Sequence, residues 1–262
     1  VVKGTILLAD EGINGSISAK EDDLNEIISH IKKILNIRKI EIKINSTNFL
    51  PFNKLKVRLK KEIVSLGQGN IDVNKDRGKL LNTNEWNKII SNKSTKLIDV
   101  RNNFEIEIGS FKNACNLKTE SFRDFPKKFD TLNLKKNTKI AMYCTGGIRC
   151  EKASAYLKKK GFKNIYQLKG GILEFLKNNK NKKNSNWNGE CFVFDKRVSI
   201  NKNLIRGKYT QCYGCRRPLS KKDLKSKLYE KGVSCEYCYF ERTDQQKKRS
   251  ISRQIQIEKR LN

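Results

Sequence analysis

The stretch from residue 83 to residue 180 alternates short apolar runs with segments of helical periodicity, and this alternation limits the folds open to the chain. Strands that alternate with helices favour a mostly parallel β-sheet with helices packed on it, which is the α/β class. The expected strands are Lys96–Val100, Lys139–Cys144 and Asn164–Leu168, and the expected helices lie at Trp86–Ile90, Glu151–Lys160 and Ile172–Asn178.

Residues 1–66 predict a separate α+β unit that is consistent with part of a ferredoxin-like sandwich. The chain has no initiator Met and opens directly on a strand, so we expect this unit to be truncated at its N-terminus. The expected elements are strands at Val2–Ala9, Ile40–Ile44 and Lys56–Val64, a glycine-containing turn at Asp10–Ser16 and an amphipathic helix over 21–35.

Two polar stretches divide the chain. Residues 67–82 contain Gly and Asn breakers and are expected to be a linker, and residues 181–190 form an Asn/Lys tract. We therefore expect three domains, at 1–66, 83–180 and 191–262. The third is the most basic, because from residue 196 onwards 19 Lys or Arg stand against six Asp or Glu, a net charge of +13.

Composition excludes several classes of function. No run approaches about 18 consecutive apolar residues, so we expect no membrane span. Eight Cys without a secretory signal indicate a reducing compartment, the cytoplasm, and metal or catalytic roles for thiols. His30 is the only histidine, which argues against a His-based iron centre, a His-rich zinc site and a Ser–His–Asp triad. Chemistry is expected to use Cys, Arg, Asp or Glu.

One cysteine lies where a strand passes into a helix through a glycine loop. Loop glycines let successive backbone N–H groups turn inward and bind an anion, and the following helix adds the positive end of its dipole. A neighbouring arginine adds a fixed cation, so the thiolate is favoured over the thiol. The alternative is a buried structural cysteine at a strand end. The loop comprises Cys144, Thr145, Gly146, Gly147, Ile148 and Arg149.

Four further cysteines form two Cys-x-x-Cys pairs in the third domain, with 19 residues between the pairs. This spacing is typical of a structural zinc site with four thiolates. Reduced thiols, a redox disulfide and iron held by four thiolates remain alternatives. A metal would supply much of the folding free energy of so small a basic domain. The residues are Cys212, Cys215, Cys235 and Cys238.

The net charge of the whole chain is +30, and aromatic residues lie among the basic residues around the Cys pairs. Lys and Arg neutralise phosphates, and exposed aromatic rings stack on unpaired bases. The third domain is therefore expected to contact nucleic acid, although a merely solvated Lys-rich surface remains an alternative for any single residue. Residues 244–262 are expected to be a terminal helix or a tail that orders on RNA.

The central domain resembles the rhodanese family. The resemblance rests on Leu97–Arg101, Glu105, Gly109 and the Cys144 loop, in which four residues separate Cys144 from Arg149. It implies that Cys144 attacks a sulfane sulfur and holds it as a persulfide. We interpret Asp99 and Arg101 as scaffold residues, with an auxiliary role in the site as the alternative. Cys150 is expected to pack in the core or to act as a second thiol that resolves an oxidised Cys144.

The resemblance extends over nearly the whole chain. The blocks KGTILLADEGINGS, PFNKLKVRLKKEIV, SFRDFP, CTGGIRCEKASAYL, KGGILEFL and WNGECFVFDKRV occur in this order. Together they are similar to the bacterial rhodanese-domain tRNA uridine hydroxylases. This family implies an acylphosphatase-like form of the N-terminal ferredoxin-like unit, a rhodanese domain with a parallel sheet and a small basic Cys-rich C-terminal domain. It also implies oxygen-dependent conversion of uridine 34, in the tRNA anticodon loop, to 5-hydroxyuridine at Cys144.

Two other functions are left open by the sequence. A rhodanese-type sulfurtransferase needs only the Cys144 loop, and a non-catalytic zinc-containing RNA-binding module needs only the third domain. The sequence identifies no cofactor that would activate oxygen, no electron donor and no stable protein partner.

Overall fold

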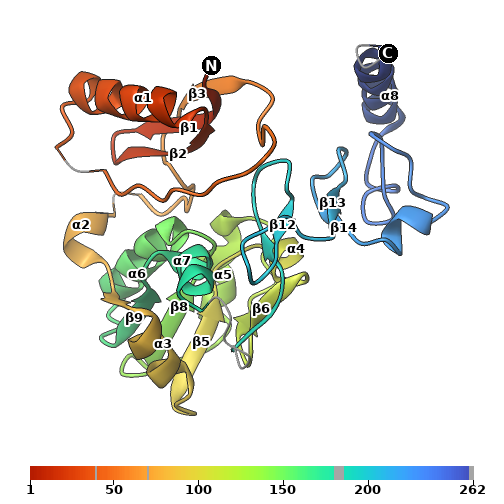
Figure 1. Ribbon diagram of the computed structural model, residues 1–262. Helices are drawn as coiled ribbons and strands as arrows, with labels where there is room; N and C mark the ends of the chain where they lie inside the picture. The colour runs from red at the N-terminus through yellow and green to blue at the C-terminus, as the bar shows by residue number, and fades with distance from the viewer. Residues whose placement is uncertain (39, 70, 180–185, 260–262) are drawn as a thin grey trace. The chain divides into compact units, whose positions relative to one another are not determined.

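The computed structural model describes residues 1–38, 40–69, 71–179 and 186–259 (Figure 1). The chain separates into two compact units, Val1–Ser65 and Leu66–Asn262, and each is described by itself. Residues 180–185, which include the first half of the expected polar tract, lie outside the described residues, as does Leu261 near the end of the expected terminal helix.

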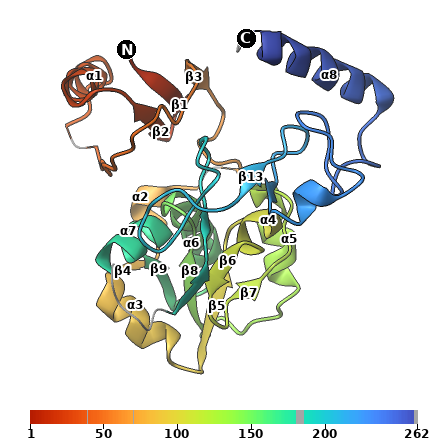
Figure 2. The same cartoon turned by 45° about the vertical axis from the view of Figure 1, so that its right-hand side comes forward.

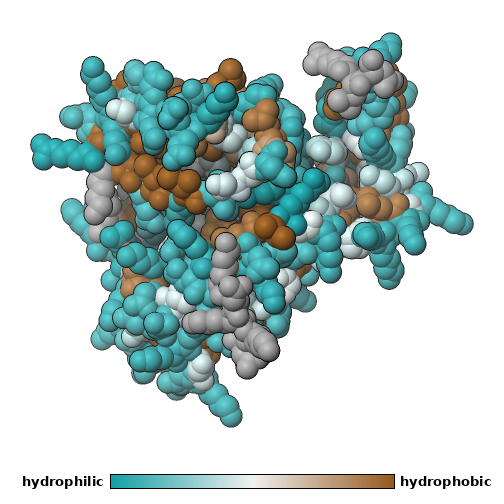
Figure 3. Space-filling model, viewed as in Figure 1, coloured by the Kyte–Doolittle hydropathy of each residue, from teal (hydrophilic) through white to brown (hydrophobic). Residues whose placement is uncertain are grey.

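The first unit is a three-stranded sheet with one helix, in the strand order β2-β1-β3. β1 and β2 form an antiparallel hairpin, and β3 pairs with β1 in parallel. Figure 3 shows apolar patches among the hydrophilic residues of the surface. Val57 and Leu59 of β3 are among the exposed apolar residues of this unit. The elements are β1 (Lys3–Ala9), β2 (Gly12–Ser18), α1 (Glu21–Ile34) and β3 (Leu55–Leu59).

Two expectations for the first unit are wrong. The segment 10–16 is not a turn throughout, because β2 begins at Gly12 and pairs with β1. Gly15 serves this pairing through its small size, since a Cβ there would lie 2.5 Å from the carbonyl oxygen of Thr5. Residues 40–44 form no strand, and Ile44 is 75% exposed. Alternation of apolar and charged residues makes a strand only where a neighbouring edge supplies backbone partners, and β3 takes the place beside β1.

The second unit contains the expected parallel sheet, with five strands in the order β4-β9-β8-β5-β7 (Figures 1 and 2). Every pair of neighbours in it is parallel. The linker expected at 67–82 is wrong for its last residues, because β4 pairs with β9. The strands are β4 (Lys79–Leu81), β5 (Thr95–Asp99), β7 (Cys115–Asn116), β8 (Lys139–Tyr143) and β9 (Ile165–Leu168).

Helices pack against this sheet, with α3 on β5 and α6 on β8 and β9. The expected helices at 86–90, 151–160 and 172–178 are all present, and each begins one to three residues earlier than expected. Asn82 starts the first of them with a capping box, in which its side chain accepts from the Asn84 and Glu85 amides. The helices are α2 (Val73–Asp76), α3 (Thr83–Ile90), α4 (Asn103–Ile106), α5 (Phe125–Asp130), α6 (Ile148–Lys159) and α7 (Gly171–Asn178).

The last residues of the expected polar tract belong to the core of the second unit. β10 (Trp187–Gly189) pairs antiparallel with β6 (Gly109–Phe111). The ring of Trp187 meets that of Phe111 edge-on at 5.3 Å, and Phe111 meets Tyr143 edge-on at 4.7 Å. Edge-to-face aromatic contacts of this kind stabilise a core beyond the area they bury. The chain beyond residue 186 therefore completes the domain instead of merely following it.

The rest of the chain has little regular structure. Short hairpins lead to a final helix, which buries only Ser250 among its described residues. Arg253 of this helix donates hydrogen bonds to the carbonyl oxygens of Tyr213 and Gly232. The expected terminal helix is thus confirmed from residue 244 to residue 259. Within the described residues, no helix has the length and apolar character needed to cross a membrane. The elements are β11 (Cys191–Phe192), β12 (Ser199–Ile200), β13 (Thr210–Gln211), β14 (Pro218–Leu219) and α8 (Asp244–Lys259).

Candidate active site

Cys144 lies at the carboxyl end of β8, at the base of the loop that leads into α6. Ligands of parallel α/β sheets bind at this end of the strands, because the following helices point their N-termini there. Gly147 precedes the helix with φ of +103°, a conformation that suits glycine. Its amide donates a hydrogen bond of 3.1 Å to the Cys144 sulfur. The sulfur is therefore held by the backbone of its own loop, as the glycine pattern predicted.

The environment of Cys144 favours the thiolate. Burial of the residue opposes ionisation, since Cys144 is only 1% exposed. A hydrogen bond from the Cys150 thiol, the charge of Arg149, and the amides of Cys150 and Gly147 outweigh this cost and lower the pKa of Cys144 to about 5. Burial beside this thiolate raises the pKa of Cys150 well above its ordinary value. Cys144 is thus favoured as the thiolate, and Cys150 as the thiol that donates a hydrogen bond to it.

Arg149 is fixed by a buried carboxylate. Its two terminal nitrogens donate to the two oxygens of Glu105 at 2.6 and 2.8 Å, and Glu105 is fully buried. Although burial opposes ionisation of Glu105, the Arg149 charge lowers its pKa below the ordinary value. Arg149 therefore acts on Cys144 through its charge, while its hydrogen bonds hold Glu105. In the sequence, Glu105 was only part of the resemblance to the rhodanese family, and no pattern pointed to its partner.

Asp99 and Arg101 brace the turn that carries Glu105. The guanidinium of Arg101 bonds both oxygens of Asp99 and the carbonyl oxygens of Glu105 at 3.2 Å and Gly109 at 2.6 Å. Both side chains are fully buried, and the ring of Trp187 lies 5.3 Å from the Arg101 guanidinium. These contacts are those of scaffold residues. A buried pair whose hydrogen bonds are all satisfied retains its geometry because every alternative leaves a charge without a partner.

The start of α7 is hydrogen-bonded to the backbone of the reactive loop. Ile172 and Leu173 donate their amides to the carbonyl oxygens of Cys144 and Thr145 at 3.0 and 3.2 Å. Gly171 makes this approach possible, since it has φ of +67° and a Cβ there would lie 2.6 Å from the Cys144 carbonyl oxygen. Sequence reasoning did not assign this role, although the paired glycines before α7 were a usable sign of a close backbone approach.

Two residues of the segment after the polar tract also reach the site. Cys191 is fully buried, and burial raises its pKa to about 12. Phe194 lies with its ring centroid 6.0 Å from the Arg149 guanidinium and is 67% exposed. Nothing in the sequence analysis pointed to Phe194.

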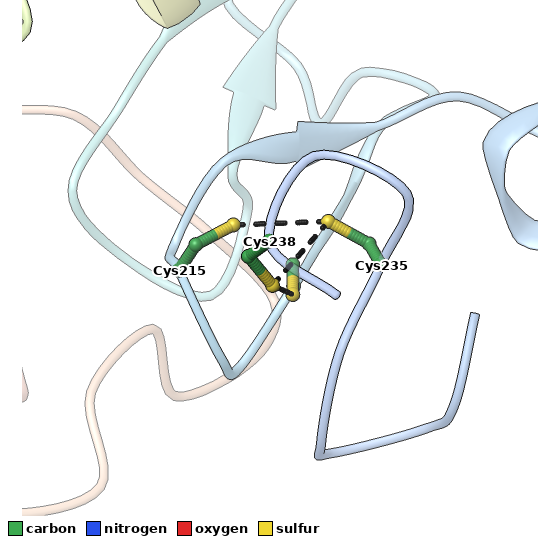
Figure 4. A group of neighbouring side chains, drawn as sticks. Cys215, Cys235 and Cys238 are labelled. Atoms are coloured by element: carbon green, nitrogen blue, oxygen red, sulfur yellow. Dashed lines mark hydrogen bonds between the residues drawn. The ribbon is translucent and has the colours of Figure 1, made fainter. Parts of the chain in front are cut away.

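The four cysteines of the two Cys-x-x-Cys pairs form a second, separate cluster (Figure 4). Their sulfur atoms all lie within 4.8 Å of one another. The sulfur separations are 3.9 Å from Cys212 to Cys238, 3.7 Å from Cys215 to Cys235 and 3.9 Å from Cys235 to Cys238. A tetrahedral site with Zn–S bonds of about 2.3 Å has edges of about 3.8 Å. The donor set therefore fits zinc in both chemistry and size.

The fold and site define a rhodanese-like domain joined to a small α+β domain. Residues 82–178 match the rhodanese-like domain, and residues 1–63 match the UPF0176 acylphosphatase like domain. A tRNA uridine(34) hydroxylase of Pelagibacter ubique is 52% identical over 257 residues, which are 98% of this chain and 84% of that protein. The chain belongs to the tRNA uridine(34) hydroxylase family, which confirms the resemblance carried by the six sequence blocks.

Solved structures align with part of the chain. A rhodanese-related protein from Thermoplasma volcanium is 27% identical, covers 38% of this chain and 92% of that one, and has a TM-score of 0.33. A rhodanese-like domain protein from Staphylococcus aureus is 26% identical, covers 37% and 90% of the two chains, and has a TM-score of 0.32.

Proposed function

We propose that this chain is an oxidoreductase that hydroxylates uridine 34 of tRNA, with Cys144 as its reactive group. The observation that carries the proposal is a cysteine whose pKa is lowered to about 5, in a chain 52% identical to a tRNA uridine(34) hydroxylase. Perturbed pKa values of this kind gather at catalytic sites. The reaction converts the C–H bond at carbon 5 of the uracil ring to C–OH with one oxygen atom of dioxygen, and an external two-electron donor with two protons reduces the other atom to water.

Each residue around Cys144 has a part in this proposal. The loop amides and the Cys150 thiol hold the sulfur as an anion. Arg149, anchored by Glu105, keeps a positive charge beside it and offers a counter-charge to an anionic substrate. Cys150 positions the Cys144 thiolate through its hydrogen bond as long as Cys144 is reduced. If Cys144 is oxidised, the neighbouring Cys150 thiol can react with it and restore it through a disulfide.

The substrate is a tRNA anticodon loop in this proposal. The net charge of +30 favours a polyanion. Near the four-cysteine cluster, aromatic rings pair with cations: Arg216 lies 5.6 Å from the Tyr213 ring and Arg217 5.5 Å from the Tyr237 ring. Phe240 is 82% exposed. Exposed rings and cations together bind unpaired bases and the phosphates that join them.

The four-cysteine cluster holds a structural zinc ion in this proposal. Four protein thiolates fill a tetrahedral coordination shell and leave no position for a substrate, so the ion stabilises the fold and takes no part in the reaction. The surrounding part of the chain supports this role, because its buried residues gather around the cysteines themselves. All eight cysteines lie among the described residues and are free thiols, which suits the reducing cytoplasm where tRNA is modified.

Sulfur transfer is the second candidate function. The observation that favours it is the loop geometry, since a bound persulfide needs the same inward amides and the same low pKa of Cys144. The two candidates differ in the atom that reaches the uracil ring.

Nucleoside analysis of tRNA from cells that express the wild-type chain or Cys144→Ser distinguishes them. Oxygen addition and replacement of oxygen by sulfur change the nominal mass equally, so exact mass or a sulfur label is required. Loss of 5-hydroxyuridine in the variant supports the hydroxylase. Loss of a sulfur-bearing uridine supports the transferase, and unchanged nucleosides contradict both.

A further inference from the structure

Phe194 is an exposed aromatic side chain at the edge of the reactive loop. It is 67% exposed, and its ring centroid lies 6.0 Å from the guanidinium of Arg149, whose hydrogen bonds to Glu105 fix it in place. The same Arg149 charge lowers the pKa of Cys144, so the ring, the cation and the thiolate belong to one site. None of the roles given above to the residues of this site accounts for Phe194.

The ring is held in one orientation by aromatic contacts beneath it. Phe194 meets Phe192 edge-on, with ring centroids 5.0 Å apart. Phe192 is 1% exposed and itself meets Phe104 edge-on at 5.3 Å. Phe192 therefore supplies the core packing of this segment, while Phe194 keeps most of its surface in solvent. Exposed apolar side chains are common on protein surfaces, so the feature that distinguishes Phe194 is its position beside Arg149.

The turn that follows Phe194 is rigid and strained. The carboxylate of Asp195 accepts hydrogen bonds from the backbone amide of Arg197 at 2.9 Å and from its guanidinium at 2.6 Å. Val198 has φ of +64°, and its amide donates to the carbonyl oxygen of Asp195 at 3.0 Å. A β-branched residue in the left-handed region is a genuine outlier, and such strain gathers at functional sites.

We propose that Phe194 stacks on the base that Cys144 modifies and holds it over the reactive loop. The identity of that base as uracil 34 rests on the proposed function. Anticodon bases are unpaired and can be turned outward, and a flat aromatic face beside a fixed cation is the surface on which such bases stack. Phe194 accordingly positions the substrate, and Cys144 remains the reacting group.

The test uses anticodon stem-loop RNA with either uridine or an abasic residue at position 34, and it measures the dissociation constant of the full chain for each. Stacking of one base on an aromatic side chain predicts that the wild type prefers uridine by about 5- to 150-fold. Phe194→Ala should lose this preference, and Phe194→Tyr should keep it. Ile205→Ala is the matched control, since Ile205 is 61% exposed on the same segment, and it should behave as the wild type.

A second readout separates stacking from support of the loop. The rate of Cys144 alkylation by iodoacetamide should be the same in the wild type and in Phe194→Ala, since the hydrogen bonds around the sulfur do not involve Phe194. A changed rate would make Phe194 a structural support and overturn the proposal. An unchanged preference in Phe194→Ala, or an equal loss in Ile205→Ala, would overturn it as well.

This binding test does not depend on turnover. If the wild type forms no 5-hydroxyuridine and yet binds the uridine loop through Phe194, the proposed function fails and base stacking stands. If 5-hydroxyuridine forms while Phe194→Ala retains the full preference for uridine, stacking fails and the proposed function stands.

Discussion

The second unit uses cysteine in two opposite ways. Cys144 stands as one thiolate, and its negative charge is balanced by amides, a neighbouring thiol and Arg149. The four cysteines at 212, 215, 235 and 238 instead face one another at separations near 3.8 Å, a distance that suits one shared zinc ion. In the first arrangement the thiolate stays available as a nucleophile. In the second, the thiolates would be bound to the metal as ligands.

The difference teaches that the neighbours of a thiol decide its role more than its burial does. Cys144 and Cys235 are both almost completely buried. Around Cys144, the sulfur accepts hydrogen bonds from the Gly147 amide and from Cys150, and Arg149 lies near it as a cation. Around Cys235, two other sulfurs lie at hydrogen-bonding distance, and the group is closed. The following experiments test this contrast, beginning with the largest expected effect.

Loss of the metal should give the largest difference between the two regions, because it should unfold the cluster region and leave the Cys144 loop unchanged. Cys235→Ser should lose bound zinc and unfold the part of the chain around the cluster, because structural zinc contributes about 10–16 kcal/mol in small domains. Metal analysis and calorimetry measure the loss, and the alkylation rate of Cys144 at neutral pH should remain that of the wild type. Purified protein that holds no metal and melts like Cys235→Ser would contradict the zinc assignment.

The pH dependence of Cys144 alkylation tests the thiolate. Because the pKa of Cys144 is lowered to about 5, the thiolate is present above that pH, and the alkylation rate should fall as pH falls through about 5. Cys150→Ala should raise the midpoint, since it removes the hydrogen bond that does most to stabilise the anion. Cys150→Ser retains a donor and serves as the control. A wild-type midpoint near 9, the ordinary value, would refute this account.

Loss of the buried ion pair should destabilise the reactive loop. Glu105→Gln leaves Arg149 buried without its counter-charge, and removal of one partner of such a pair costs about 3–5 kcal/mol. Chemical denaturation measures the free energy of unfolding. Glu107→Gln, at an exposed neighbour, should change it by less than about 1 kcal/mol. Equal effects of the two variants would show that Glu105 does not anchor the site.

A methyl group at the base of the loop should have a smaller effect. Gly171→Ala places a Cβ 2.6 Å from the carbonyl oxygens of Cys144 and Thr145 at φ of +67°, and strain of this kind costs about 1–3 kcal/mol. Gly146→Ala is the matched control, because a Cβ there meets nothing within 4 Å. The free energy of unfolding should fall in the first variant and stay within about 0.5 kcal/mol in the second. The reverse order would contradict the packing of α7 beneath the loop.

The smallest effect is expected at an ion pair on the surface. Arg217 donates to Glu120 at 2.8 Å, and the Glu120 side chain is 64% exposed. Exposed pairs contribute at most about 1 kcal/mol, so Glu120→Ala should barely change the free energy of unfolding. A loss above about 2 kcal/mol would mean that this pair fastens the cluster region to the rhodanese-like domain.

Sequence patterns predicted the structure best where the pattern and the contacts are local. The strands β5, β8 and β9 and the helix α1 lie where periodicity placed them. The failed strand at 40–44 shows the limit, because alternation records which side chains could face a core and not whether a neighbouring strand is available. β4 and β7 were missed for a related reason, since strands of two or three residues depend on their neighbours.

By itself the sequence determined the reactive loop and each of the two Cys-x-x-Cys pairs. The loop and each single pair span fewer than ten residues, so local backbone geometry brings their groups together. Only the tertiary structure decided which distant groups meet them. Glu105 reaches Arg149 across 44 residues, and Phe194 reaches it across 45. Such contacts depend on how strands and helices pack, and no local periodicity records that packing. The charge of Arg149 and the hydrogen bonds of neighbouring groups then make Cys144 an anion in spite of its burial, which its spacing alone could only favour.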